Sequence, residues 1–184
     1  MAGTLCVILV AGITYKVSSS APQPAAPDMA NAGAGQPERA PDISRMSPRE
    51  RFDRLFNRIM QAAERGESDQ VQRFTPMALG AYQQLDTVDA DARYHAAVIH
   101  LQVGSLPQAR ALADTILTQT PGHLFGYLIR GTAAGIENDA GAERRAQQDF
   151  LSHYEREMAA NRLEYVDHKA VVEEFRQEAQ SRKQ

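Results

Sequence analysis

Apolar side chains recur every three to four positions from residue 46 onward, which is the spacing of one face of an α-helix. Ser47, Pro48 and Glu50 suit the N-cap, the first and the third position of a helix, and Gly66 suits its end. The sequence therefore predicts a first helix over 51–63 whose apolar stripe comprises Phe52, Leu55, Phe56, Ile59, Met60 and Ala63.

The same spacing predicts two further pairs of helices and a terminal helix. The pairs are 92–103 with 108–117 and 124–136 with 142–158, and the last helix covers 163–181. Turn-forming segments rich in Gly, Pro, Asn and Asp separate them, at 104–107, 121–122 and 137–141. No alternating stretch bounded by turn residues predicts a strand, so we expect an all-α fold of about seven helices.

Composition divides the 184 residues into three segments. Residues 1–15 contain no charged side chain, residues 18–45 contain five prolines and no aromatic residue, and all six phenylalanines follow residue 46. We therefore expect a hydrophobic anchor or signal segment at 1–17, an extended or disordered Pro/Ala-rich linker at 18–46, and a folded domain at 47–184.

The first segment has three interpretations: an uncleaved membrane anchor, a signal peptide, and a buried or interfacial helix. The anchor is favoured, because no basic residue precedes the apolar stretch as a signal peptide requires, and Tyr15 and Lys16 suit a membrane interface. Fifteen helical residues span only about 22 Å, which suggests that the true start lies upstream.

Localisation follows from this anchor and from cysteine usage. A Pro/Ala linker after an N-terminal anchor commonly leads to an exported domain, and the folded segment has no cysteine, which fits an oxidising compartment. We expect the folded domain on the periplasmic side of a bacterial membrane. The alternative is a soluble periplasmic protein after signal cleavage.

Charge and candidate ligands argue against several functions. A net charge of −3 gives no basic footprint for nucleic acid, and Cys6 alone can build neither an internal disulfide nor a cysteine-based zinc site. His95 and His100 are five positions apart and so do not share a helix face, and His123 is expected to cap or pack. Asp86, Asp89 and Asp91 are interpreted as capping and turn residues. We therefore expect no catalytic residue, metal or cofactor.

A repeat of 34 to 38 residues relates the helix pairs. A shift of 34 places Ala97 on Gly131 and the turn at Gly104 on Asn138, and a shift of 38 places Gly66 on Gly104. The unit 90–123 has a small residue in each helix, a glycine in the turn and a proline at its end, namely Ala97, Ala109, Gly104 and Pro121. This unit resembles the tetratricopeptide repeat, and degenerate units precede and follow it.

The resemblance implies a solenoid of helical hairpins that binds partners on the concave face formed by the first helices. An unrelated helical bundle is the alternative fold. When the family's concave-face positions are carried over to this sequence, the face comprises Phe56, Met60, Tyr94, Val98, Leu101, Phe125, Leu128 and Thr132. The alternative is that these side chains form the core. The last helix is expected to cap the array, with docking of a partner as its alternative role.

Together these features predict a non-catalytic, membrane-anchored adaptor that binds and stabilises another protein. An accessory subunit of a respiratory, photosynthetic, secretion or envelope-assembly complex would fit. The alternative is a transient periplasmic assembly chaperone, and an enzyme is the least favoured class.

Overall fold

The computed structural model describes residues 46–181. Within that range the chain forms eight α-helices and no strand, which confirms the predicted all-α class. The helices are α1 (Pro48–Glu64), α2 (Ser68–Tyr82), α3 (Ala90–Gln102), α4 (Leu106–Gln119), α5 (Leu124–Ile136), α6 (Ala140–Ala159), α7 (Leu163–Asp167) and α8 (Lys169–Ser181).

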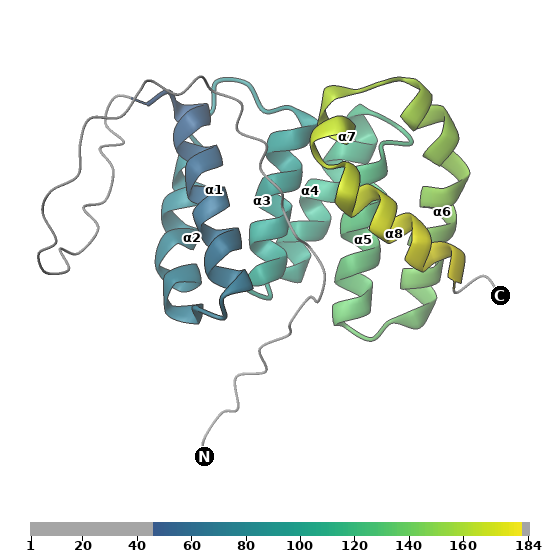
Figure 1. The fold of residues 1–184 in the computed structure, drawn as a ribbon, viewed down its shortest axis with the longest axis horizontal. Coiled ribbons are helices and arrows are strands. Elements are labelled where there is room, and N and C mark those ends of the chain that lie inside the picture. The colour runs from purple at the N-terminus through teal and green to yellow at the C-terminus, as the bar shows by residue number, and fades with distance from the viewer. Residues whose placement is uncertain (1–45, 182–184) are drawn as a thin grey trace, which may run out of the picture.

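Successive helices pair into three hairpins, α1–α2, α3–α4 and α5–α6, which lie side by side in chain order (Figure 1). The first helices form a continuous row, because α3 contacts both α1 and α5. Each helix of the row contributes a fully buried aromatic residue: Phe56, Tyr94 and Phe125. The core is therefore shared between neighbouring hairpins, as in an array of stacked helical pairs.

The start of α1 follows the prediction closely. The hydroxyl of Ser47 accepts a hydrogen bond from the backbone N–H of Glu50, and the Glu50 carboxylate accepts one from the backbone N–H of Ser47 at 2.9 Å. This reciprocal capping satisfies two N–H groups that a helix start otherwise leaves without partners.

The turns between paired helices share one backbone conformation. Gly66, Gly104 and Asn138 each follow the first helix of a hairpin, with φ of 70°, 72° and 59°. Glycine adopts positive φ at little cost, and asparagine tolerates it better than most residues. The predicted repeat register therefore places equivalent turn residues at equivalent positions.

Two glycine-to-alanine substitutions should have opposite effects on stability. A Cβ at Gly104 or at Gly80 would meet no atom within 4 Å, so space does not distinguish the two sites. Gly104→Ala should destabilise by about 1 to 2 kcal/mol because it forces an L-residue to positive φ. Gly80→Ala, inside α2, should stabilise by about 0.5 to 1 kcal/mol. Urea unfolding of both variants tests this, and equal signs would contradict the turn geometry.

The prediction of one continuous helix over 163–181 is wrong, because the helix is interrupted at His168. Tyr165 and His168 are buried against the hairpins, whereas Leu163 and Val166 of α7 are exposed. Beyond the interruption α8 runs across α5 and α6 (Figure 1). Because the helix is interrupted, α7 and α8 can bury apolar faces that point in different directions. The buried face of α8 comprises Val171, Val172, Phe175 and Ala179.

The small residues of the repeat are buried, but one has an unexpected neighbour. Ala97 and Ala109 are fully buried in α3 and α4, and Pro121 lies just beyond the end of α4. A Cβ on Gly131 would lie 2.6 Å from Cζ of Phe175 and 3.5 Å from Cβ of Ala146. The absence of a side chain at Gly131 therefore allows α8 to pack closely against α5. It also allows close packing of α6, the second helix of the same hairpin, at a slightly larger distance.

The anchor predicted at 1–17 and nearly all of the linker predicted at 18–46 lie outside the described residues. Among residues 46–181, no helix combines the length and the apolar character needed to cross a membrane.

Candidate functional site

The eight residues predicted to line a concave binding face lie in the row formed by α1, α3 and α5. All but Thr132, which is half-buried, are buried within the chain itself, with exposed fractions of 8% or less. These side chains therefore do not form the free binding surface that was predicted. They belong to the core, which is the alternative left open for Phe56, Met60, Tyr94, Val98, Leu101, Phe125 and Leu128.

The C-terminal segment, α7 and α8 with His168 between them, covers part of this row. Tyr94 and Phe125 stack with ring centroids 4.2 Å apart. The ring of Tyr165 meets Phe125 edge-on at 5.4 Å, and the ring of His168 meets Tyr94 edge-on at 5.0 Å. A C-terminal segment thus packs on the face of α3 and α5 that was predicted to bind a partner.

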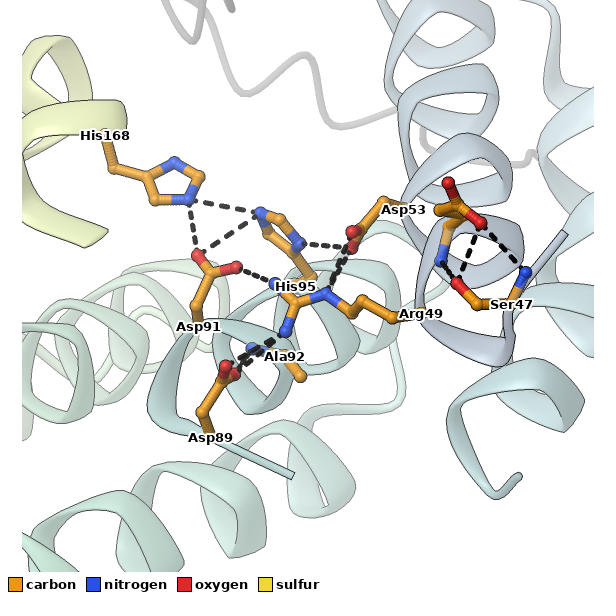
Figure 2. A network of polar contacts seen from close by, with 9 residues as sticks. Ser47, Arg49, Asp53, Asp89, Asp91, Ala92, His95 and His168 are labelled. Carbon is orange, nitrogen blue, oxygen red and sulfur yellow. Dashed lines mark hydrogen bonds and ion pairs between the residues drawn. The ribbon is translucent and has the colours of Figure 1, made fainter. Parts of the chain in front are cut away.

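His168 also joins a polar cluster with Asp91 and His95 of α3 (Figure 2). Its Nε2 lies 2.8 Å from Asp91 Oδ1 and 3.1 Å from Nε2 of His95. The His95 ring stacks on Phe56 with centroids 3.9 Å apart. The ring of His168 also meets Phe125 of α5 edge-on at 5.4 Å, so all three helices of the row contact this cluster.

Arg49 of α1 connects the cluster to two further carboxylates (Figure 2). Its guanidinium pairs with Asp53 at 2.8 Å, with Asp89 at 3.0 Å and with Oδ2 of Asp91. Burial acts to raise the pKa of Asp91, but the hydrogen bond from His168 and the positive charges around the carboxylate outweigh it, so the pKa is lowered to about 2. Asp91 is therefore ionised at neutral pH.

A second polar network fixes α7 against the start of α5. The Tyr165 hydroxyl accepts a hydrogen bond from the backbone N–H of Leu124 at 2.9 Å and donates one to Glu157 at 3.1 Å. Burial, followed by the nearby Glu157 carboxylate, raises the pKa of this hydroxyl well above its ordinary value. His123 caps α5 through Nδ1 and contacts Glu164 through Nε2 at 3.2 Å, which confirms its predicted capping role.

The burial of His123 predicts a pH effect on stability. Burial lowers its pKa despite the opposing effect of Glu164, so the unfolded chain binds the proton more readily than the folded one. Stability should then fall as the pH drops below the ordinary histidine pKa of about 6.5. His123→Asn keeps a capping side chain without a titrating group. Chemical unfolding between pH 7.5 and 5 should show a smaller loss in the variant, and parallel profiles would contradict this.

The polar cluster was not predicted from the sequence, where His95 was compared only with His100. The informative spacing is Asp91 to His95, four positions apart, which places both side chains on one face of α3. Of the aspartates interpreted as capping residues, Asp89 is the N-cap of α3 and accepts from Ala92 N–H at 2.7 Å. Asp91 lies inside the helix. His168 is more than 70 positions away, and no local pattern identifies it.

Asp91, His95 and His168 together have the chemistry of a metal-binding group. Each offers one ligand atom, and the three atoms lie within 4.8 Å of one another. Comparison of the chain with family models, with curated proteins and with solved structures found no match. The fold and site define an all-α hairpin array that carries its own C-terminal segment on the row of first helices, and the tetratricopeptide resemblance stays a prediction.

Proposed function

We propose that the protein is a non-catalytic adaptor, built as a tetratricopeptide-like array, that binds and stabilises another protein. The architecture supports this role. Stacked helical hairpins present an extended surface to which helices and extended segments can dock. The row of first helices already holds such a segment, because Tyr165 of α7 lies against Phe125 and His168, just after α7, lies against Tyr94.

One observation carries the proposal: the two most exposed large apolar side chains of the described residues lie together on α7. Leu163 is 79% exposed and Val166 is 63% exposed. They are three positions apart and so share one face of the helix. Tyr165, between them in sequence, is anchored to Leu124 and Glu157 and holds the helix in place. A fixed apolar pair is suited to contact an apolar segment of a partner.

The proposed adaptor acts at a membrane. The apolar segment at 1–17, in which Lys16 is the only charged residue, would hold the chain at a membrane, with the hairpins on the periplasmic side. An accessory subunit of a membrane complex fits this placement better than a freely diffusing protein does. A transient assembly chaperone would use the same apolar pair and differ in how long the partner stays bound.

The test is co-purification of the full-length protein from its own membranes in a mild detergent, with mass spectrometry of what is retained. Leu163→Asp combined with Val166→Asp should reduce the retained partner at least about tenfold, because burying two such side chains contributes on the order of 3 kcal/mol. Met77→Asp, on the exposed face of α2, is the matched control, since Met77 is 44% exposed.

The outcomes separate the alternatives. A partner retained in stoichiometric amount by the unaltered protein and the Met77 variant, and lost from the double variant, supports a permanent subunit. Substoichiometric retention with the same dependence on α7 supports the chaperone. Equal retention by all three proteins would show that α7 is not the contact, and no saturable partner at all would contradict the adaptor role.

A further inference from the structure

Three potential metal ligands converge at the contact between α3 and the C-terminal segment (Figure 2). They are Oδ1 of Asp91, Nε2 of His95 and Nε2 of His168. The two nitrogen atoms are 3.1 Å apart, and the Asp91 oxygen lies 2.8 Å from the His168 nitrogen and 3.7 Å from the His95 nitrogen. Both imidazoles are buried, and the Asp91 side chain is 19% exposed.

Hydrogen bonds alone cannot satisfy all three of these atoms well. A neutral imidazole nitrogen presents in the ring plane either one hydrogen or one lone pair, and an ionised carboxylate only accepts. If Nε2–H of His168 donates its one hydrogen to the Asp91 carboxylate, Nε2 of His95 also faces Nε2 of His168. No hydrogen is then left to form a linear hydrogen bond between the two nitrogens. If both nitrogens carry hydrogens, those hydrogens face each other. A single cation among the three atoms would interact favourably with all of them.

The dimensions of the triangle are comparable to those of a zinc coordination sphere. Zinc binds histidine nitrogen and carboxylate oxygen at about 2.0 to 2.2 Å, so neighbouring ligand atoms of a tetrahedral site are roughly 3.3 Å apart. The three separations here, from 2.8 to 3.7 Å, bracket that value. We propose that Asp91, His95 and His168 bind one divalent zinc-class ion, which fastens the C-terminal segment to α3.

Charged residues surround the ligands. Nδ1 of His95 lies 3.7 Å from Asp53 Oδ1, beyond hydrogen-bond distance, on the side of the ring opposite the ligand triangle. Arg49 holds the other oxygen of Asp91 and is itself held by Asp53 and Asp89. Such partners orient the ligands and typically affect metal affinity by about 10- to 100-fold.

Charge and ligand type indicate which ion would bind. Arg49 faces three carboxylates, those of Asp53, Asp89 and Asp91, and histidine binds a metal as neutral imidazole, so the site that receives the ion carries two net negative charges. A divalent ion balances them. Two imidazole ligands favour zinc and similar transition metals over calcium and magnesium, which prefer oxygen ligands. Three protein ligands leave a fourth position for water.

The experiment is calorimetric titration of Zn²⁺ into the full-length protein, purified without a polyhistidine tag and treated with a chelator. One ion should bind per chain. His168→Gln and Asp91→Asn should each weaken binding at least about 100-fold, and Asp53→Asn about 10- to 100-fold. His153→Gln is the control, because His153 lies on α6 beside Tyr127 and should leave the affinity within about twofold.

X-ray absorption of the zinc-loaded unaltered protein keeps the test independent of how the variants fold. The expected ligand shell of the zinc ion contains two imidazole nitrogens and oxygen donors, and no sulfur. Failure of the folded protein to bind one Zn²⁺ would overturn the proposal. Unchanged affinity in the His168 and Asp91 variants, or a shell without two imidazoles, would overturn it as well.

Discussion

Phe125→Ala should cost about 3 to 5 kcal/mol of unfolding free energy, as the loss of a fully buried phenylalanine does elsewhere. Phe125 has no exposed surface, and its ring stacks on Tyr94 and meets Tyr165 and His168 edge-on. The substitution therefore removes the contact that the middle hairpin, the last hairpin and the C-terminal segment share. Denaturant unfolding of the full-length protein is the measurement.

The control for Phe125→Ala is Arg110→Ala. Arg110 forms an ion pair with Glu137 at the surface, and such pairs contribute at most about 1 kcal/mol. If Phe125→Ala leaves the unfolding midpoint unchanged but abolishes partner binding, the row of first helices is an open groove after all. A large loss of stability supports the core assignment.

Phe175→Ala should also cost about 3 to 5 kcal/mol, because this ring attaches α8 to the last hairpin. Phe175 meets Phe150 edge-on with centroids 4.9 Å apart and lies against Gly131. The test includes Gly131→Ala in both backgrounds. Next to Phe175 the added methyl group would lie 2.6 Å from the ring and gain nothing, whereas with alanine at 175 it should recover about 1 kcal/mol of helix propensity.

Equal effects of Gly131→Ala in the two backgrounds would show that Phe175 does not lie against α5. A small effect of Phe175→Ala would show that α8 contributes little to the fold. Either result would contradict the docking of the C-terminal segment on the last hairpin.

Local sequence signals predicted most of the fold. The bounds of α5 and the capping residues of α1 follow from patterns within a few positions, namely an apolar stripe, a Ser–Pro–x–Glu start and a glycine end. The turn residues Gly104 and Asn138 were identified from the repeat, since positive φ restricts the residues that a tight turn can use.

The fold differs from the sequence prediction where packing between distant segments decides the outcome. Phe56, Tyr94 and Phe125 share a face, as the repeat register implied, but nothing in their own helices indicates that residues 163–168 cover it. The interruption at His168 has the same origin, because Asp91 and His95 lie more than 70 positions earlier. Asp91 and His95 could have been noticed as a pair four positions apart, whereas His168 could not.

The C-terminal segment of the chain is docked on α3 through His168. A double-mutant cycle of Asp91→Asn with His168→Gln tests it most directly. Unfolding free energies of the full-length protein would be measured in the presence of chelator and again with Zn²⁺.

A matched cycle would pair His168→Gln with Asp114→Asn, whose partner is Arg130 at the surface. Docking predicts a coupling of about 1 to 3 kcal/mol for the Asp91 pair, larger with Zn²⁺, and additivity for the Asp114 pair. Additivity of the Asp91 and His168 variants within about 0.3 kcal/mol would contradict the account.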